Sequence, residues 1–255
     1  MHTAFVQNPL LGSDSFMTKF RQQLSGASPY TAWLAAEMLY VMNLFPSARA
    51  IGGEAKRRMV REVWELSGNP LPDSELLAVL DSGIGHPGTA YLTRRDRELE
   101  YLIAVATDLK ARPTEAGEVL ADPWATARML EQVPGGGRRL LRHILLNLLF
   151  PDVFEGIVSA AHRTHILNAF PDHLTDFQSA AGDSDLIVTD RAILHIRDRL
   201  ESELGRTIDF YETDIRARWQ PQNLPGPVVD IALPPQDDEP PIHAQRVAEV
   251  REDAT

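Results

Sequence analysis

Apolar residues recur at every third or fourth position along most of the chain, which is the spacing of one helix face. The repeat begins at Phe16 and widens over Trp33–Phe45, and Pro46 then ends that helix. Gly205 is placed to cap the last predicted helix. The remaining predicted helices are one that starts at 70–73 and others over residues 53–66, 95–111, 123–132, 138–149, 160–169 and 187–204.

Strand signals are few in this sequence. No segment alternates apolar and polar residues over a sustained run between turn signals. Thr207–Tyr211 and Val228–Leu233 are the only modest strand candidates. The predicted fold class is therefore all-α, mainly helical, with room for a minor β element near the C-terminal end.

Two glycine-rich breaks interrupt the helical pattern. Three glycines and a proline within Asp81–Tyr91 exclude a regular helix and predict a shaped loop. Gly135–Gly137 is expected to be a flexible connector, which suggests an N-terminal helical subdomain, 14–133, and a C-terminal helical subdomain, 137–219. The helix lengths fit one body equally well. Residues 220–255 are acidic and rich in proline, and we expect them to be a disordered tail.

Acidic residues outnumber basic residues, 36 to 25, so the net charge is −11. Residues 221–255 hold seven acidic and two basic residues, a net charge of −5, and residues 1–220 therefore carry −6 (−11 minus −5). Non-specific binding to nucleic acid requires a basic footprint. An attraction of the whole protein to DNA is thus excluded, and a local basic face remains open.

The absence of cysteine excludes a disulfide framework, cysteine-ligated zinc and a thiol nucleophile, and it fits a reducing compartment. Residues 1–15 lack the basic and apolar segments of a secretory signal. The longest apolar-rich segment, Trp33–Phe45, contains Glu37 and Asn43 and is too short to span a bilayer. We expect a cytoplasmic protein that does not enter a membrane.

Motifs for nucleotide hydrolysis and for nucleophilic catalysis do not occur. None of the three lysines precedes Ser or Thr, so there is no Walker A motif, and there is no Gly-x-Ser-x-Gly elbow. Pro72-Asp73 with Asp108-Leu-Lys110 matches the letters of a magnesium-dependent nuclease. The lysine lies inside a helical pattern, however, which favours surface charges on helices.

Histidines could also mark a metal site. His162 and His165 are three positions apart on one predicted helix, with His143 and Glu155 upstream. A solvated or interface helix is the favoured interpretation of this set. We therefore assign no catalytic residue, no metal and no cofactor.

A sharp corner is predicted at Leu148–Ile157, which reads Leu-Leu-Phe-Pro-Asp-Val-Phe-Glu-Gly-Ile. A helix ends at Phe150 and Pro151, and Asp152 is placed to cap the following turn. Phe150 and Phe154 are expected to lie in the core. The structural signature of the corner comprises Phe150, Pro151, Asp152, Phe154 and Glu155.

The corner, continued to Ser159, resembles a signature in the N-terminal region of McrB-like AAA+ ATPases. That signature reads approximately Leu-Leu-Phe-Pro-Asp-x-Phe-Glu-x-Ile-x-Ser and is followed by a basic segment. The resemblance covers about residues 15–219. Other segments agree with the family in their order, namely Ala35–Tyr40, Gly85–Tyr91, Asp122–Trp124, Ile196–Leu200 and Ile208–Tyr211.

The resemblance implies a non-catalytic recognition or adaptor region of a restriction or antiphage-defence complex. In such complexes an AAA+ motor acts on DNA and a nuclease partner cuts it. The region would bind DNA or a partner protein, with the motor and nuclease subunits as its partners. The family usually continues into an AAA+ module that this chain lacks, so a fragment or a separately encoded part is expected. A stand-alone helical interaction or regulatory protein and a metal-dependent nuclease are the alternatives.

Candidate DNA contacts come from two places. A basic stripe opens the helix predicted at 138–149, beside His143, and arginines suit phosphate contacts. A second pair lies in 161–165, where the family has a basic segment richer in lysine than this one. A solvated face that pairs with acidic neighbours is the alternative for the stripe. The candidate DNA-binding residues are Arg138, Arg139, Arg142, His162 and Arg163.

Overall fold

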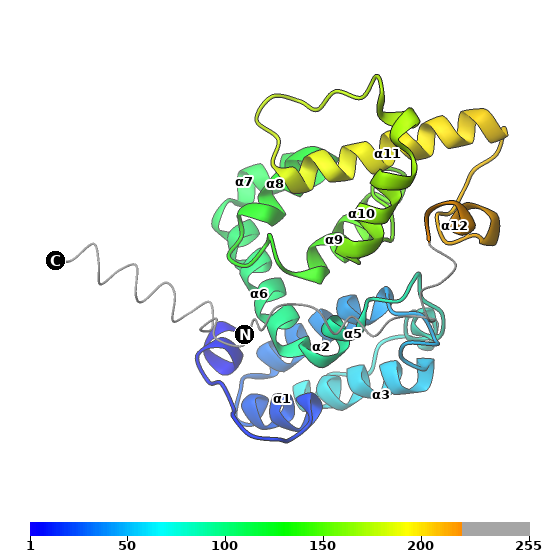
Figure 1. The fold of residues 1–255 in the computed structure, drawn as a ribbon. Coiled ribbons are helices and arrows are strands. Elements are labelled where there is room, and N and C mark those ends of the chain that lie inside the picture. Colours follow the sequence, from blue (N-terminus) through cyan, green and yellow to red (C-terminus); the bar gives the residue numbers. More distant parts are fainter. Residues whose placement is uncertain (221–255) are drawn as a thin grey trace.

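The apolar repeats form helices that gather in two groups, seen at the bottom and at the top of Figure 1. The structure is a computed structural model and describes residues 1–220. The lower group consists of α1 (Phe16–Leu24), α2 (Pro29–Leu44), α3 (Gly53–Trp64), α4 (Ser74–Ala78) and α5 (Thr89–Thr93). The upper group consists of α8 (Pro123–Gln132), α9 (Leu140–Leu149), α10 (Ala160–Ala169), α11 (Asp185–Leu204) and α12 (Thr213–Trp219).

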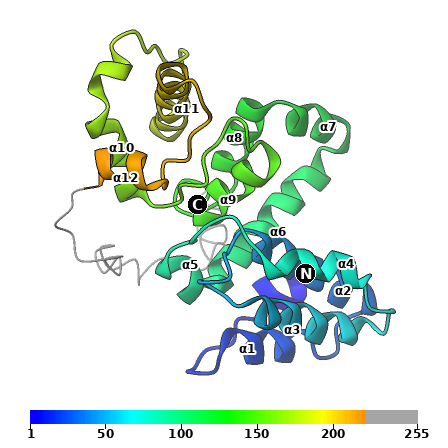
Figure 2. The same ribbon diagram turned by 90° about the vertical axis from the view of Figure 1, so that its right-hand side faces the viewer.

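Helix α6 connects the two groups. It spans Arg95–Ala111 and is followed at once by α7, Pro113–Ala121. In Figure 2, α6 runs from the lower group up to α7, and α11 is seen nearly end-on above α10 and α12. Short turns complete the order: a π-helical turn at His2–Val6 and 3₁₀ turns at Glu65–Ser67, Val79–Asp81 and Pro171–Leu174.

Serine residues fix where several helices begin. The hydroxyl oxygens of Ser15 and Ser28 accept hydrogen bonds from backbone N–H groups three residues on, at 3.2 Å in both cases. Ser159 and Ser184 cap α10 and α11 in the same way. A side-chain acceptor satisfies one of the N–H groups that a helix start leaves open, which explains these boundaries. Gly205 caps the end of α11, as predicted.

Three α-helices were not predicted: α5, α7 and α12. Helix α5 begins at Thr89, inside the predicted loop Asp81–Tyr91. Pro113 follows the helix predicted at 95–111 and occupies the first turn of α7, where its missing N–H costs nothing. Helix α12 is short and lacks a long apolar repeat. The helix expected from 70–73 begins at Ser74, because the Asp73 carboxylate caps it through Glu75 N at 3.0 Å.

The all-α class is confirmed for residues 1–220. Thr207–Tyr211 is irregular chain between α11 and α12, so its prediction as a strand is wrong. The β-type contact within this part of the chain is one isolated bridge between Pro46 and Gly85. Val228–Leu233 and the predicted tail beyond residue 220 lie outside the described residues. In the part that is described, no helix has the length and apolar character needed to cross a membrane.

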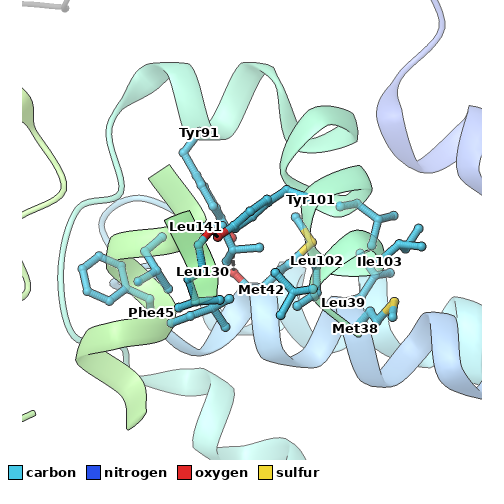
Figure 3. Packing of buried hydrophobic residues seen from close by; sticks show 14 of the residues in the cluster. Met38, Leu39, Met42, Phe45, Tyr91, Tyr101, Leu102, Ile103, Leu130 and Leu141 are labelled. Carbon is cyan, nitrogen blue, oxygen red and sulfur yellow. Dashed lines mark hydrogen bonds between the residues drawn. The ribbon is translucent and has the colours of Figure 1, made fainter. Parts of the chain in front are cut away.

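The first hydrophobic core is built around α2 and α6 (Figure 3). Met42 on α2 is fully buried, and so are Tyr91 and Tyr101. Both phenol groups have buried acceptors: Tyr91 Oη donates to the carbonyl of Met42 at 2.8 Å, and Tyr101 Oη donates to the carbonyl of Leu130 at 2.6 Å. Satisfied hydroxyls allow these large rings to be buried without an orphaned polar group.

The second hydrophobic core is smaller and joins α10, α11 and α12. Its buried members run from Ile157 to Trp219, and Trp219 Nε1 donates to the carbonyl of Phe210 at 2.7 Å. The first core continues through α9 to Val158 and also includes Ile187 of α11. The two cores adjoin at residues 157 and 158, and the division into subdomains 14–133 and 137–219 stays a prediction.

The Gly135–Gly137 connector is closely packed. A Cβ atom at Gly136 would lie 2.1 Å from the carbonyl oxygen of Leu130, well inside contact distance. Gly136 N donates to the carbonyl of Val133 at 2.8 Å. Glycine is required here because backbone meets backbone, so the connector is a fixed turn between α8 and α9.

The two corner phenylalanines differ in burial, contrary to the expectation that both are core residues. Phe154 is 3% exposed and its ring centre lies 5.0 Å from that of Trp124, whereas Phe150 is only half-buried. We expect Phe154→Ala to lower the free energy of unfolding by about 3–5 kcal/mol and Phe150→Ala to lower it by clearly less. Urea unfolding of both variants checks this, and equal losses would contradict the placement.

Candidate functional site

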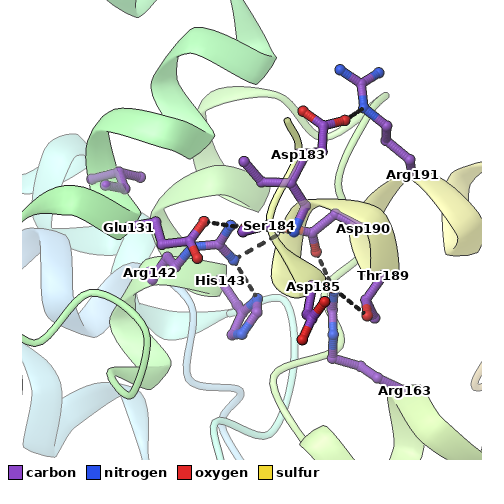
Figure 4. Close-up of polar contacts among 12 residues, drawn as sticks. Glu131, Arg142, His143, Arg163, Asp183, Ser184, Asp185, Thr189, Asp190 and Arg191 are labelled. Carbon is purple, nitrogen blue, oxygen red and sulfur yellow. Dashed lines mark hydrogen bonds and ion pairs between the residues drawn. The ribbon is translucent and has the colours of Figure 1, made fainter. Parts of the chain in front are cut away.

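Two of the predicted DNA-contacting arginines meet at one buried carboxylate (Figure 4). Arg142 of α9 donates to Asp190 Oδ2 of α11 through both terminal nitrogens, at 3.2 Å each. Arg163 of α10 donates to Asp190 Oδ1 and to the carbonyl of Ile157, the latter at 3.3 Å. The exposed fractions of Arg142, Arg163 and Asp190 are 0%, 5% and 5%.

This burial corrects the assignment of Arg142 and Arg163 as phosphate contacts. A guanidinium with no exposed surface cannot reach a DNA backbone in this conformation. The network of Arg142, Asp190 and Arg163, which we call the arginine–aspartate joint, instead ties three helices together. Arg142 binds one oxygen of Asp190 and Arg163 binds the other, so the carboxylate supplies a charged acceptor to both buried guanidinium groups.

His143 lies against the arginine–aspartate joint. Burial and the nearby positive charges of Arg163 and Arg142 hold the pKa of His143 well below its ordinary value of 6.5. Arg142 Nη1 lies 3.4 Å from His143 Nδ1, and a guanidinium can only donate. The imidazole is therefore neutral at physiological pH, with its Nδ1 lone pair toward Arg142.

Further ion pairs extend the joint to α8. Asp183, just before α11, accepts from Arg191 Nε at 2.6 Å and from Arg128 at 3.2 Å. The Arg191 guanidinium also lies 3.9 Å from the centre of the Trp124 ring, a cation–π contact. The polar cluster of Figure 4 thus holds α8, α9, α10 and α11 in one arrangement.

The other arginines of the stripe, Arg138 and Arg139, precede α9. Arg138 is exposed and Arg139 is half-buried. The first N–H groups of α9 already have a partner, because Glu98 of α6 accepts from Leu141 N at 2.8 Å and from Leu140 N at 3.4 Å. A carboxylate thus occupies the helix start where a phosphate would otherwise bind.

Glu98 is itself an unusual group. It is 4% exposed, and burial raises its pKa from 4.5 to about 7, against the opposing effect of the two N–H groups and Arg139. The carboxyl group therefore changes charge near neutral pH.

His162 is placed apart from the stripe. Its Nδ1 lies 3.0 Å from Tyr211 Oη, and its ring centre is 5.1 Å from that of Trp219. The predicted DNA-binding set is thus divided: one pair precedes α9, one pair is buried at Asp190, and His162 contacts the segment around α12. These residues do not form one basic face.

The glycine loop, residues 82–88, and the corner at 148–157 come together at Phe45. A Cβ atom at Gly85 would lie 3.0 Å from the Phe45 ring, and one at Gly156 would lie 3.5 Å from it. Backbone bonds fasten the loop, because Ile84 N donates to the carbonyl of Phe45 and Ser47 N to that of Gly85, both at 2.8 Å. The buried Lys56 also stabilises the loop, because its Nζ donates to the carbonyl of Pro46 at 2.8 Å and to that of Ser82 at 2.5 Å.

The corner is held from α9 and from α11. Asn147 Nδ2 donates to the carbonyl of Phe154 at 2.8 Å. Arg197 pairs with Glu155 at 2.7 Å and donates to the carbonyl of Asp152. Asp152 was predicted to cap a turn through its side chain. In the structure its backbone carbonyl accepts the hydrogen bond from Arg197. Burial raises the pKa of Glu155, with Arg197 opposing.

The metal-binding interpretations find no support in the placement of their residues. Asp73 caps α4, while Asp108 pairs with Arg112 at 2.6 Å on α6. Glu155 pairs with Arg197, and His143 and His162 have the separate partners given above. Among residues 1–220 no three histidine, aspartate or glutamate side chains come close enough to hold a metal ion.

Sequence reasoning missed Asp190 and Glu98, the two acceptors on which these contacts depend. Asp190 stands between Ile187 and Ile193 at helical spacing, and Glu98 precedes Leu99 on a helix with apolar residues on most sides. A carboxylate inside an apolar stripe is the available signal, because burying it requires partners.

Comparison with known proteins gives no match, whether to a protein-family model, to a curated protein or to a solved structure.

Removal of the central carboxylate tests the arginine–aspartate joint. Asp190→Ala would leave two buried guanidiniums without a counter-charge, so we expect the free energy of unfolding to fall by about 3–5 kcal/mol. Asp176→Ala is the control and should unfold like the wild type, because it removes an exposed carboxylate that pairs with Arg199 and His195 of α11, the helix that carries Asp190. A wild-type urea midpoint for Asp190→Ala would refute the joint.

Glu98 predicts a pH dependence of stability. Its folded pKa of about 7 exceeds the unfolded value of 4.5, so the folded state holds the proton more tightly. The stability from this group is present below pH 4.5 and is lost as the pH rises through 7, by on the order of 3 kcal/mol. The stability of the wild type relative to Glu98→Gln should therefore decrease between pH 4.5 and 8. Urea unfolding at several pH values measures it, with Glu118→Gln on α7 as the control, and a constant difference would contradict it.

Proposed function

We propose that this chain is a non-catalytic recognition or adaptor module of a McrB-like AAA+ restriction or antiphage-defence complex, and that it binds a protein subunit of that complex. The observation that carries the proposal is the packing of the segments on which the resemblance rests. Three of these segments, Gly85–Tyr91, Asp122–Trp124 and the corner at 148–157, are distant in the sequence and come together in space.

The contacts of this unit are specific. Gly85 of the segment Gly85–Tyr91 and Gly156 of the corner lie against the same Phe45 ring. Trp124, from the segment Asp122–Trp124, packs edge-on against Phe154 of the corner. Side chains that pack together constrain one another's size and shape. Such packing is expected if these segments share their order with the family because they share its fold.

A protein partner is favoured over DNA for three reasons. Residues 1–220 carry a net charge of −6. Arg142 and Arg163 are buried at Asp190. The start of α9, which could have bound a phosphate, holds Glu98. DNA binding depends on phosphate neutralisation by exposed cations, and these features reduce it.

Affinity purification from the chain's own host tests the proposal. The tagged protein should recover an AAA+ ATPase with Walker A and B motifs, identified by mass spectrometry, and the tag alone should not recover it. The purified chain should not hydrolyse ATP unaided. Repeated recovery without any AAA+ subunit, or ATP hydrolysis by the chain alone, would refute the proposed function.

DNA is the alternative outcome. Fluorescence polarisation with plain and modified duplexes should show no saturable binding at about 150 mM salt. Saturable binding that Arg138→Glu with Arg139→Glu abolishes would place DNA, and not a protein, at the start of α9.

A further inference from the structure

Five of the thirteen large apolar side chains that are exposed in the described part of the chain lie within 19 positions, from residue 66 to residue 84. Their exposed fractions run from 42% to 57%. We call these residues the α4 surface: Leu66, Leu71, Leu76, Val79 and Ile84. Single exposed apolar residues are ordinary, whereas a concentration of them marks a contact surface.

The short helix α4 and the 3₁₀ turn after it are apolar on both sides. Leu77 and Leu80 are buried at 3% and 0% exposure and supply the core. Leu76 and Val79, three positions apart and thus on one face, are 46% and 51% exposed. The core does not require this outward apolar pair.

The segment that carries the α4 surface is fastened along α2. The ring centres of Trp33 and Trp64 lie 6.0 Å apart, and Trp64 Nε1 donates to the carbonyl of Pro70 at 2.8 Å. Further along α2, Tyr40 Oη donates to the carbonyl of Leu76 at 2.9 Å. At the end of α2, Ile84 N donates to the carbonyl of Phe45 at 2.8 Å. From Trp33 to Phe45 a helix rises by roughly 18 Å, so the segment follows α2 over about that length.

The segment that carries the α4 surface contributes acidic side chains and no lysine or arginine. Between Arg61 and Arg94 there is no lysine or arginine, while five acidic residues occur: Glu62, Glu65, Asp73, Glu75 and Asp81. Glu62 pairs with Arg21, and Asp81 pairs with Arg57. Glu65 and Glu75 are exposed and directly precede Leu66 and Leu76.

We propose that the α4 surface binds a basic amphipathic helix of a partner protein, of about three turns. The apolar side chains at 66–84 would receive its apolar face, and the acidic residues beside them would meet its lysines and arginines. A length of roughly 18 Å matches about 12 helical residues. This inference rests on the proposed function and names the kind of segment that the AAA+ or nuclease subunit would supply.

Model peptides test the charge preference. Fluorescein-labelled peptides of about 14 residues, with leucine at helical spacing and either lysine or glutamate elsewhere, are titrated by fluorescence polarisation. The wild type should bind the lysine peptide at least about tenfold more tightly than the glutamate peptide, and Glu65→Gln with Glu75→Gln should reduce that ratio. Equal affinity for both peptides would overturn the proposal.

A matched pair of variants tests the location. Leu76→Ser with Val79→Ser removes exposed side chains and should leave urea unfolding unchanged while weakening the lysine peptide by about tenfold or more. Leu204→Ser is the control, because Leu204 is 43% exposed and is the last residue of α11, outside the α4 surface. Unchanged binding by the double variant, or an equal loss with Leu204→Ser, would overturn the proposal.

Co-purification separates the two proposals. If the double variant at Leu76 and Val79 recovers the AAA+ subunit as well as the wild type does, the α4 surface is not the docking site and the proposed function stands. If the lysine peptide binds as expected and no AAA+ subunit is recovered by the wild type, the proposed function fails and the α4 surface remains a site for basic helices.

Discussion

Desolvation of Arg142 and Arg163 is the constraint on which the arrangement of the upper helices depends. Two guanidinium groups can remain buried only where a carboxylate and a carbonyl reach their N–H groups, and Asp190 and Ile157 supply these. The three charged residues come from α9, α10 and α11, so none of these helices can shift without exposing an uncompensated charge. The second core is small, and this electrostatic requirement complements its packing.

Close backbone approach plays the corresponding part in the lower half of the molecule. Phe45 ends α2 between Gly85 and Gly156, and the loop and the corner come near it because neither glycine has a side chain. The result is a joint between α2, the glycine loop and the end of α9. Apolar side chains at 66–84 are then displayed on a well-fastened segment, which reduces the entropy that a partner must remove on binding.

Helix positions could be predicted from the sequence because apolar spacing and capping residues act locally. Pro46 and Gly205 marked real helix ends, and the glycine loop was identified from composition alone. The site could not be predicted in the same way. Arg138 and Arg142 look alike in the sequence, yet one is exposed and the other is fully buried, because Asp190, 48 residues further on, determines the position of Arg142. The close packing of Gly136 was missed for a different reason: glycine indicated flexibility, whereas the turn brings Gly136 against the backbone at the end of α8.

The burial of Lys56 has a practical consequence for chemical probes. The chain has three lysines, and the Nζ of Lys56 is enclosed by the carbonyls of Pro46 and Ser82 beneath the glycine loop. Reagents that acylate amines should label Lys19 and Lys110 readily, while Lys56 reacts only when the loop lifts from Phe45. The rate of acylation at this one position thus reports the local opening of the loop without any engineered label.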